Sequence, residues 1–180
     1  MMEKLRRCAF ASDIGSGGIT CCGVTDNAES RQGGAAVRVP PPLVFVGAIA
    51  VGWLLPGLRV HGYHGARIAI GALLVAGGIA LAVAAIGLFR KTGQDPKPWQ
   101  PTPELIFQGP YQHTRNPMYV GMTLLTLGAA ALAGHGWIAV LAFAALAIVH
   151  GTAVLPEERY LTAKFGEPYL AYKAKVRRYL

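Results

Sequence analysis

One long uncharged run constrains this sequence more than any other feature. Ile68 to Phe89 is a stretch of about 22 residues without a charged side chain, and about 20 apolar residues let a helix cross the hydrocarbon core of a bilayer. Only 14% of the residues in the chain are charged, against about 25% in soluble domains. So few charges cannot cover a water-facing surface, whereas an apolar surface can face lipid. We therefore expect an integral membrane protein.

Three further apolar runs accompany this one, and together they predict an all-α polytopic protein with about four transmembrane helices. The expected spans are residues 43–58, 68–89, 118–133 and 137–155. The first run is short for a span, but Trp53 and Arg59 extend it by interfacial anchoring and snorkelling. Only Gly134-His135-Gly136 separates the last two runs, so these should form a tight antiparallel hairpin.

The remainder of the chain is polar or irregular. Residues 1–36 are rich in Gly, Ser and Ala without a sustained period, which predicts a disordered extension ahead of a membrane domain at residues 37–180. This extension contains Cys8, Cys21 and Cys22, whose spacing matches no zinc or redox template. We expect free thiols and no metal site.

Two polar blocks flank the predicted hairpin. Arg90 to Pro117 is a long loop with six prolines, Pro117 included, and a loop of this length is usually functional. In the tail, residues 156–180, apolar side chains recur at three- and four-residue steps with basic residues between them. This pattern predicts an amphipathic tail that lies against the membrane surface. Its apolar positions are Leu161, Phe165, Tyr169, Tyr172 and Val176.

The distribution of basic residues predicts orientation and partners. The net charge is +8, and both polar blocks carry much of it beside apolar runs, which favours anionic membrane lipids as partners rather than nucleic acid. The hairpin tip has no Lys or Arg. By the positive-inside rule, both termini and the active site should be cytoplasmic, although Arg59 and Arg67 argue mildly for the opposite side.

The two blocks also contain the candidate chemistry. Arg115 lies just before Pro117 at an expected helix start, where free backbone N–H groups also favour anions. It suits a carboxylate or phosphate ligand, or it anchors the helix to lipid phosphates. In the second block, Glu157 and Glu158 follow the last span. They can accept hydrogen bonds from ribose hydroxyls, pair with Arg115, or form a solvated helix N-terminus.

At these residues the chain resembles the isoprenylcysteine carboxyl methyltransferases and related phospholipid methyltransferases. The first matching stretch is Gly109 to Gly121 (GPYQHTRNPMYVG), which enters a span. The second is Glu157 to Tyr172 (EERYLTAKFGEPYLAY), followed by Val176-Arg177-Arg178. The resemblance covers roughly residues 37–180.

This resemblance implies a membrane methyltransferase that binds S-adenosylmethionine without a Rossmann domain. Its methyl acceptor would be lipophilic: the carboxylate of an isoprenylcysteine-like compound or the amine of a phospholipid headgroup. By position in the motif, the cofactor-binding residues would be Glu104, Leu105, Ile106, Tyr111, Asn116, Pro117, Met118, Tyr119 and Glu157. Arg115 and Glu158 occupy the matching catalytic positions, with their exact roles open. Ala153 stands where the prenylcysteine enzymes have an arginine, so cofactor binding carries over better than that substrate.

Two other functions remain open at this level. The NADPH-dependent sterol reductases have a similar C-terminal pattern, and a non-enzymatic small membrane protein or transporter has a comparable set of spans. A transporter should carry charged or broken spans near the middle of the membrane, where only His150 comes close.

Overall fold

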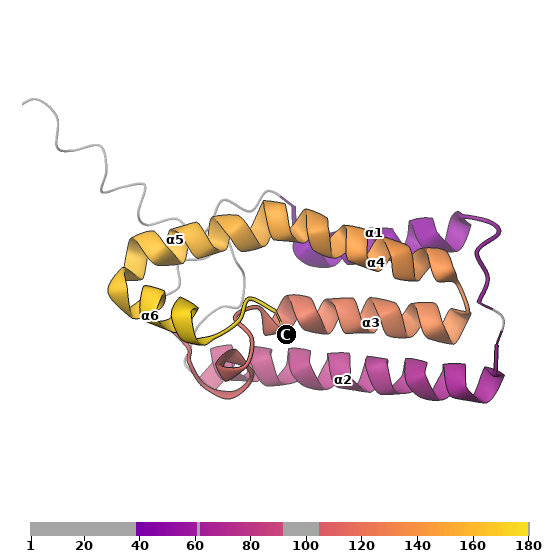
Figure 1. The fold of residues 1–180 in the computed structure, drawn as a ribbon, viewed down its shortest axis with the longest axis horizontal. Coiled ribbons are helices and arrows are strands. Elements are labelled where there is room, and N and C mark those ends of the chain that lie inside the picture. The colour runs from indigo at the N-terminus through magenta and orange to yellow at the C-terminus, as the bar shows by residue number, and fades with distance from the viewer. Residues whose placement is uncertain (1–38, 61, 92–104, 180) are drawn as a thin grey trace, which may run out of the picture. The chain divides into compact units, whose positions relative to one another are not determined.

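The computed structural model describes residues 39–60, 62–91 and 105–179. Within these ranges the regular secondary structure is helical, with only two isolated bridges between extended residues (Figure 1). The prediction of an all-α protein is therefore confirmed. The predicted disordered extension at residues 1–36, its three cysteines and Glu104 lie outside the described residues.

The helices largely follow the apolar runs. They are α1 (Pro41–Leu54), α2 (His64–Lys91), the 3₁₀ turn η2 (Gly109–Gln112), α3 (Pro117–Ala133), α4 (Gly136–Val149), the π-helical η3 (His150–Val154), α5 (Leu155–Phe165) and α6 (Glu167–Lys175). The first helix ends before Pro56, because the ring of proline disfavours a helical residue in front of it. The helix that contains the last predicted span, in contrast, continues beyond Leu155, since η3 joins α4 to α5 without leaving helical conformation.

Two helices are long and apolar enough to cross a membrane. They run from His64 to Leu88 and from Gly136 to Phe165. In their most apolar windows, only 17% and 33% of the residues are buried inside the protein, so neither resembles the core helix of a soluble protein. α1 and α3 are apolar but shorter. The prediction of about four spans thus has support for two, and the other two remain a prediction.

Helices α2 and α3 approach closely because glycines face each other between them. A Cβ atom added to Gly78 would lie 2.8 Å from the carbonyl oxygen of Gly121, and one added to Gly128 would lie 2.6 Å from the Val75 side chain. Small residues that allow such backbone contact are the usual basis of helix packing in membranes. At the neighbouring Gly77, in contrast, an added Cβ atom would meet nothing within 4 Å.

This difference between two neighbouring glycines gives a matched pair of variants. We expect Gly78→Ala to destabilise the protein by about 1–3 kcal/mol, because the added methyl forces the two helices apart. Gly77→Ala should be neutral or slightly stabilising, since alanine favours the helix by up to about 1 kcal/mol. Thermal unfolding of both purified variants in detergent micelles measures the difference. Equal unfolding temperatures would contradict the close contact at Gly78.

Backbone hydrogen bonds close the end of the bundle at the α3–α4 turn. The N–H of Val60 donates to the carbonyl of Gly134 at 2.9 Å, and the N–H of Gly136 donates to Leu58 at 2.8 Å. The imidazole of His135 is buried and stacks on Trp53, with ring centroids 4.7 Å apart. The short predicted hairpin is therefore present, and its turn is tied to the segment that follows α1.

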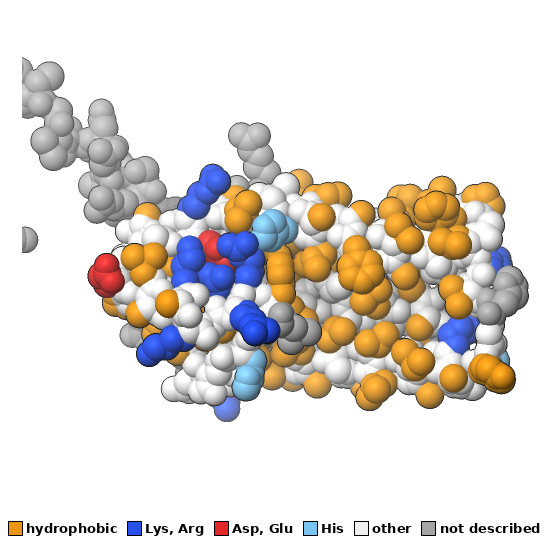
Figure 2. Space-filling view, in the orientation of Figure 1, with side chains coloured by type: hydrophobic (Ala, Val, Ile, Leu, Met, Phe, Trp, Pro, Cys, Tyr) orange, Lys and Arg blue, Asp and Glu red, His pale blue; other side chains and the backbone are white. Residues whose placement is uncertain are grey.

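Polar and apolar side chains separate along the helices. In the space-filling view, hydrophobic side chains cover most of the length occupied by α2, α3 and α4, whereas charged side chains gather around α5 and α6 (Figure 2). Large exposed apolar side chains include Leu73 on α2 and Phe143 on α4, which are 73% and 60% exposed. These faces need a lipid environment, and the polar end lies where the apolar faces stop.

The orientation in the membrane remains a prediction with a direct test. We expect the α3–α4 turn and the C-terminal tail on opposite sides, because the turn has no basic residue and the tail has several. Single cysteines at Tyr63, which is 92% exposed at the same end of the bundle as the turn, and at Lys175, in a background with Cys8, Cys21 and Cys22 replaced by serine, should react with a membrane-impermeant maleimide from opposite sides of sealed vesicles. Labelling of both from the same side would contradict this topology.

Candidate functional site

The first block is held at the beginning of α3. Pro117 occupies the first turn of this helix. A backbone N–H at this position would have no carbonyl within the helix to bond, so proline breaks no hydrogen bond there. Asn116 precedes the helix, and its backbone carbonyl accepts the N–H groups of Tyr119 and Val120, both at 3.2 Å. The side chain of Asn116 does not cap the helix. Its amide instead donates to the carbonyl of Arg178 at 3.1 Å.

The second block lies on the continuous helix that runs through η3. Because this helix does not start at Glu157, the alternative of a solvated helix N-terminus is wrong. Glu158 is buried, at 5% exposure, and Glu157 is half-buried. Successive residues of a helix point about 100° apart, so the two carboxylates face different neighbours.

Both carboxylates contact the first motif, Gly109 to Gly121. The hydroxyl of Tyr119 donates to Oε2 of Glu157 at 3.2 Å. Nη1 of Arg115 lies 3.2 Å from Oε1 of Glu158, an ion pair without good hydrogen-bond geometry. Of the alternatives for the two carboxylates, pairing with Arg115 is therefore the one that Glu158 adopts. The two polar blocks meet although about 40 residues separate them.

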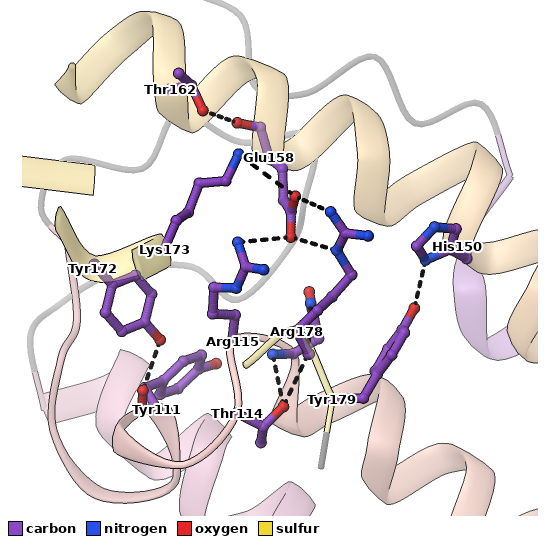
Figure 3. A network of polar contacts seen from close by, with 11 residues as sticks. Tyr111, Thr114, Arg115, His150, Glu158, Thr162, Tyr172, Lys173, Arg178 and Tyr179 are labelled. Carbon is purple, nitrogen blue, oxygen red and sulfur yellow. Dashed lines mark hydrogen bonds and ion pairs between the residues drawn. The ribbon is translucent and has the colours of Figure 1, made fainter. Parts of the chain in front are cut away.

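Glu158 is the centre of a cationic cluster, which we define as Arg115, Lys173 and Arg178 (Figure 3). Arg178 donates from Nε and Nη2 to the two oxygens of Glu158, at 2.9 and 2.8 Å. Nζ of Lys173 lies 3.9 Å from Oε2. The hydrogen bond to Glu158 raises the pKa of Arg178, so this side chain stays charged. Three cations thus share one carboxylate.

The C-terminal segment, Val176 to Tyr179, returns to the first block. From the sequence, Val176-Arg177-Arg178 was expected only as the basic end of the second motif, in a tail that lies against the membrane. The N–H of Arg115 donates to the carbonyl of Arg177 at 3.0 Å. The hydroxyl of Thr114 donates to the carbonyl of Arg178 at 3.1 Å. Together with the Asn116 amide, these bonds attach the end of the chain beside the start of α3. The predicted amphipathic tail is therefore also a cap on the bundle.

Tyrosines fill the space between the tail and the first block. The hydroxyl of Tyr172 donates to the carbonyl of Tyr111 at 2.7 Å, and Phe107 contacts the Tyr172 ring edge-on, with centroids 5.0 Å apart. Burial raises the pKa of Tyr172 to about 12 and raises that of Tyr111 as well. Both phenols are therefore neutral hydrogen-bond donors at physiological pH.

The other predicted cofactor-binding residues differ in how deeply they are buried. Leu105, Ile106 and Met118 are half-buried, and Pro117 is buried at the helix start. The structure thus brings Tyr111, Asn116, Tyr119 and Glu157 to one end of the bundle together with Arg115 and Glu158. The side-chain amide of Asn116 holds the tail through its hydrogen bond to the carbonyl of Arg178. His150, which the sequence analysis named as the residue closest to a charged position within a span, places Nδ1 2.8 Å from the hydroxyl of Tyr179.

The guanidinium group of Arg115 is short of hydrogen-bond partners. This side chain is 10% exposed, and neither Nε nor Nη1 has a hydrogen-bond partner among the described residues, although Nη1 forms the ion pair with Glu158. An unpaired buried donor of this kind is costly unless a ligand satisfies it. A carboxylate at this position would do so, because guanidinium groups bind carboxylates with paired hydrogen bonds.

Comparison with known proteins identifies the family. A family model described as phospholipid methyltransferase matches residues 66–168. The chain belongs to the phospholipid methyltransferase family. The matched residues begin near the start of α2 and include the first motif and the part of the second motif up to Pro168, so the resemblance seen in the sequence is confirmed. This family consists of membrane methyltransferases, which is also consistent with the exposed apolar faces.

A bacterial relative is similar over a shorter length. It is an uncharacterized protein of Haemophilus influenzae (strain ATCC 51907 / DSM 11121 / KW20 / Rd), 35% identical over 65 residues. The matched residues make up 35% of this chain and the whole length of the relative. No solved structure matches the chain.

Proposed function

We propose that this protein transfers a methyl group from S-adenosylmethionine to a lipophilic acceptor at the membrane surface. The observation that carries the proposal is the contact between the two family motifs, made by Tyr119 with Glu157 at 3.2 Å. The contact lies where exposed apolar helices give way to charged residues, so a soluble cofactor and a membrane-embedded acceptor can both reach this end of the bundle.

The residues at this end suit the cofactor chemically. S-adenosylmethionine has a carboxylate, an ammonium group, a ribose diol and a sulfonium methyl. The unpartnered Nε of Arg115 matches the carboxylate, and the Glu157 carboxylate can accept hydrogen bonds from ribose hydroxyls or from the ammonium group. The proposed cofactor-binding set remains Leu105, Ile106, Tyr111, Asn116, Pro117, Met118, Tyr119 and Glu157, with Glu104 just outside the described residues.

The protein's contribution to the reaction is mainly positioning. When bound, S-adenosylmethionine supplies an activated methyl group whose leaving group is a neutral thioether. The chain then needs no general acid for the leaving group. Tyr119 and Glu157 hold each other in place, Glu158 fixes Arg115, and the tail excludes water from the reacting groups. A carboxylate acceptor needs no base, whereas an amine acceptor must lose its proton before it attacks.

Titration of the purified protein with two cofactors tests this proposal. We expect saturable heat on addition of S-adenosylmethionine and none on addition of NADPH, because the family that matches this chain is one of methyltransferases. Isothermal titration calorimetry in nanodiscs measures both. Binding of NADPH alone would favour the reductase alternative, and binding of neither would favour a non-enzymatic membrane protein.

A further inference from the structure

The end of the C-terminal segment is hydrogen-bonded to the helix that carries both carboxylates. Nδ1 of His150 lies 2.8 Å from the hydroxyl of Tyr179, and the centroids of the two rings are 5.9 Å apart. His150 begins η3, between α4 and α5, and both side chains are half-buried. Neither residue belongs to the proposed cofactor-binding set, so this contact needs an explanation of its own.

A π-helical turn brings His150 to the same side of the helix as Glu158. The N–H of Leu155 donates to the carbonyl of His150, five residues earlier, so η3 contains one residue more than an α-helical turn. His150 and Glu158 are eight positions apart in the sequence, and the extra residue leaves about seven α-helical steps. At about 100° a step, seven steps nearly complete two turns. Figure 3 shows both side chains directed toward the C-terminal segment.

Successive residues of the C-terminal segment attach to different elements. The carbonyl of Arg177 accepts a backbone N–H just before α3, at 3.0 Å. The side chain of Arg178 reaches Glu158 on α5, and the side chain of Tyr179 reaches His150 in η3. The segment therefore crosses from the start of α3 to the helix that contains η3 and α5, and the Tyr179 hydroxyl makes its last attachment.

Arg178 is thereby held on both sides. Its carbonyl accepts hydrogen bonds from two side chains of the first motif, and the next residue, Tyr179, is held by His150. From this position the guanidinium of Arg178 donates to both oxygens of Glu158, at 2.9 and 2.8 Å. Glu158 in turn lies 3.2 Å from Nη1 of Arg115. A displacement of Tyr179 would therefore pass through Arg178 and Glu158 to Arg115.

We propose that His150 and Tyr179 are positioning residues for methyl transfer. Their hydrogen bond keeps the C-terminal segment in place, and the segment aligns the guanidinium of Arg115, through Arg178 and Glu158, with the carboxylate of S-adenosylmethionine. The inference rests on the proposed function, because Arg115 is the residue proposed to bind that carboxylate. Guanidinium groups bind carboxylates through paired hydrogen bonds of defined geometry, so a small displacement of Arg115 lowers the affinity.

Substitutions that remove this one hydrogen bond test the role. Tyr179→Phe keeps the ring and removes the hydroxyl, and His150→Leu removes the ring nitrogens. Each should weaken S-adenosylmethionine binding by about three- to tenfold, as expected for one neutral hydrogen bond. The double variant should bind no more weakly than either single variant, because both substitutions remove the same bond.

Two further variants provide rescue and control. His150→Gln should bind within about twofold of the unaltered protein, since a side-chain amide can donate to or accept from the Tyr179 hydroxyl. Tyr63→Phe removes a hydroxyl from a side chain that is 92% exposed at the other end of the bundle. It should leave the affinity unchanged.

Isothermal titration calorimetry in nanodiscs separates this role from a purely structural one. A loss of folded protein lowers the number of sites titrated, whereas a displaced Arg115 lowers the affinity of the sites that remain. The same titrations with decarboxylated S-adenosylmethionine identify the group on the cofactor. Because this analogue lacks the carboxylate, Tyr179→Phe and His150→Leu should leave its affinity nearly unchanged.

The outcomes distinguish this inference from the proposed function. Unchanged S-adenosylmethionine affinity in Tyr179→Phe would overturn the positioning role and leave the proposed function intact. Equal weakening for both ligands would also overturn it, because the hydrogen bond would then not act through Arg115 and the carboxylate. A fall in the number of sites alone would mean that the bond serves only stability. If the unaltered protein bound no S-adenosylmethionine, the proposed function would fail, and this inference with it.

Discussion

Glu158→Ala is expected to destabilise the polar end of the protein by about 3 kcal/mol or more, because it leaves a buried cation without its counter-charge. Glu158 is the shared partner of Arg115, Lys173 and Arg178. The side chains of Glu158 and Arg115 are only 7% and 10% exposed, so the Arg115 cation that remains is largely shielded from water. SDS-induced unfolding from mixed micelles should show a large drop in the midpoint.

The order of the single variants tests this explanation. Arg115→Ala should cost less than Glu158→Ala, because Glu158 keeps its two hydrogen bonds with Arg178. The double variant should be more stable than the sum of the two losses predicts, since it removes both members of the buried pair. Glu167→Ala, at an exposed position in the first turn of α6, should be neutral. A larger cost for Arg115→Ala would show that Glu158 is not the centre of the cluster.

The helices could be predicted from the sequence because their signals are local. Uncharged runs mark α2, α3 and α4, and Gly134 and Gly136 mark the turn of the hairpin. The turn shows why glycine is required there: Gly134 has a φ of 68°, a left-handed conformation that other residues rarely adopt. The continuation of α4 through η3 into α5 could not be predicted, because the drop in hydropathy after Leu155 looks like the end of a helix.

The site could be predicted only in part, because its geometry depends on distant segments. The family resemblance implied that Arg115 and Glu158 belong to one site, and pairing of a carboxylate with Arg115 was one of the alternatives; the structure contains this pair between Arg115 and Glu158. The sequence did not indicate that the carbonyl of Arg178 would accept hydrogen bonds from the side chains of both Thr114 and Asn116. Backbone acceptors carry no residue-specific pattern. The one available signal was the basic end of the motif, Arg177-Arg178, which places cations beside two carboxylates.

Glu157→Ala is expected to weaken S-adenosylmethionine binding by about ten- to a hundredfold, which corresponds to the roughly 1.5–3 kcal/mol typical of a hydrogen bond to a charged group. Under the proposed function, Glu157 presents its carboxylate to the cofactor while one oxygen accepts the Tyr119 hydroxyl at 3.2 Å. Glu157 takes no part in the cationic cluster, so the variant should insert and fold normally. Calorimetric titration in nanodiscs gives the affinity, and circular dichroism verifies the helical content.

Tyr119→Phe separates a direct role of Glu157 from a structural one. If Glu157 only held Tyr119 in place, deletion of the hydroxyl should weaken binding as much as deletion of the carboxylate does. If Glu157 contacts the cofactor, Tyr119→Phe should have the smaller effect, because it leaves the carboxylate charge in the site. Glu167→Ala removes an equal charge from the exposed turn after Gly166 and should leave affinity unchanged. Equal affinity in Glu157→Ala and the unaltered protein would contradict the cofactor site formed by the two motifs.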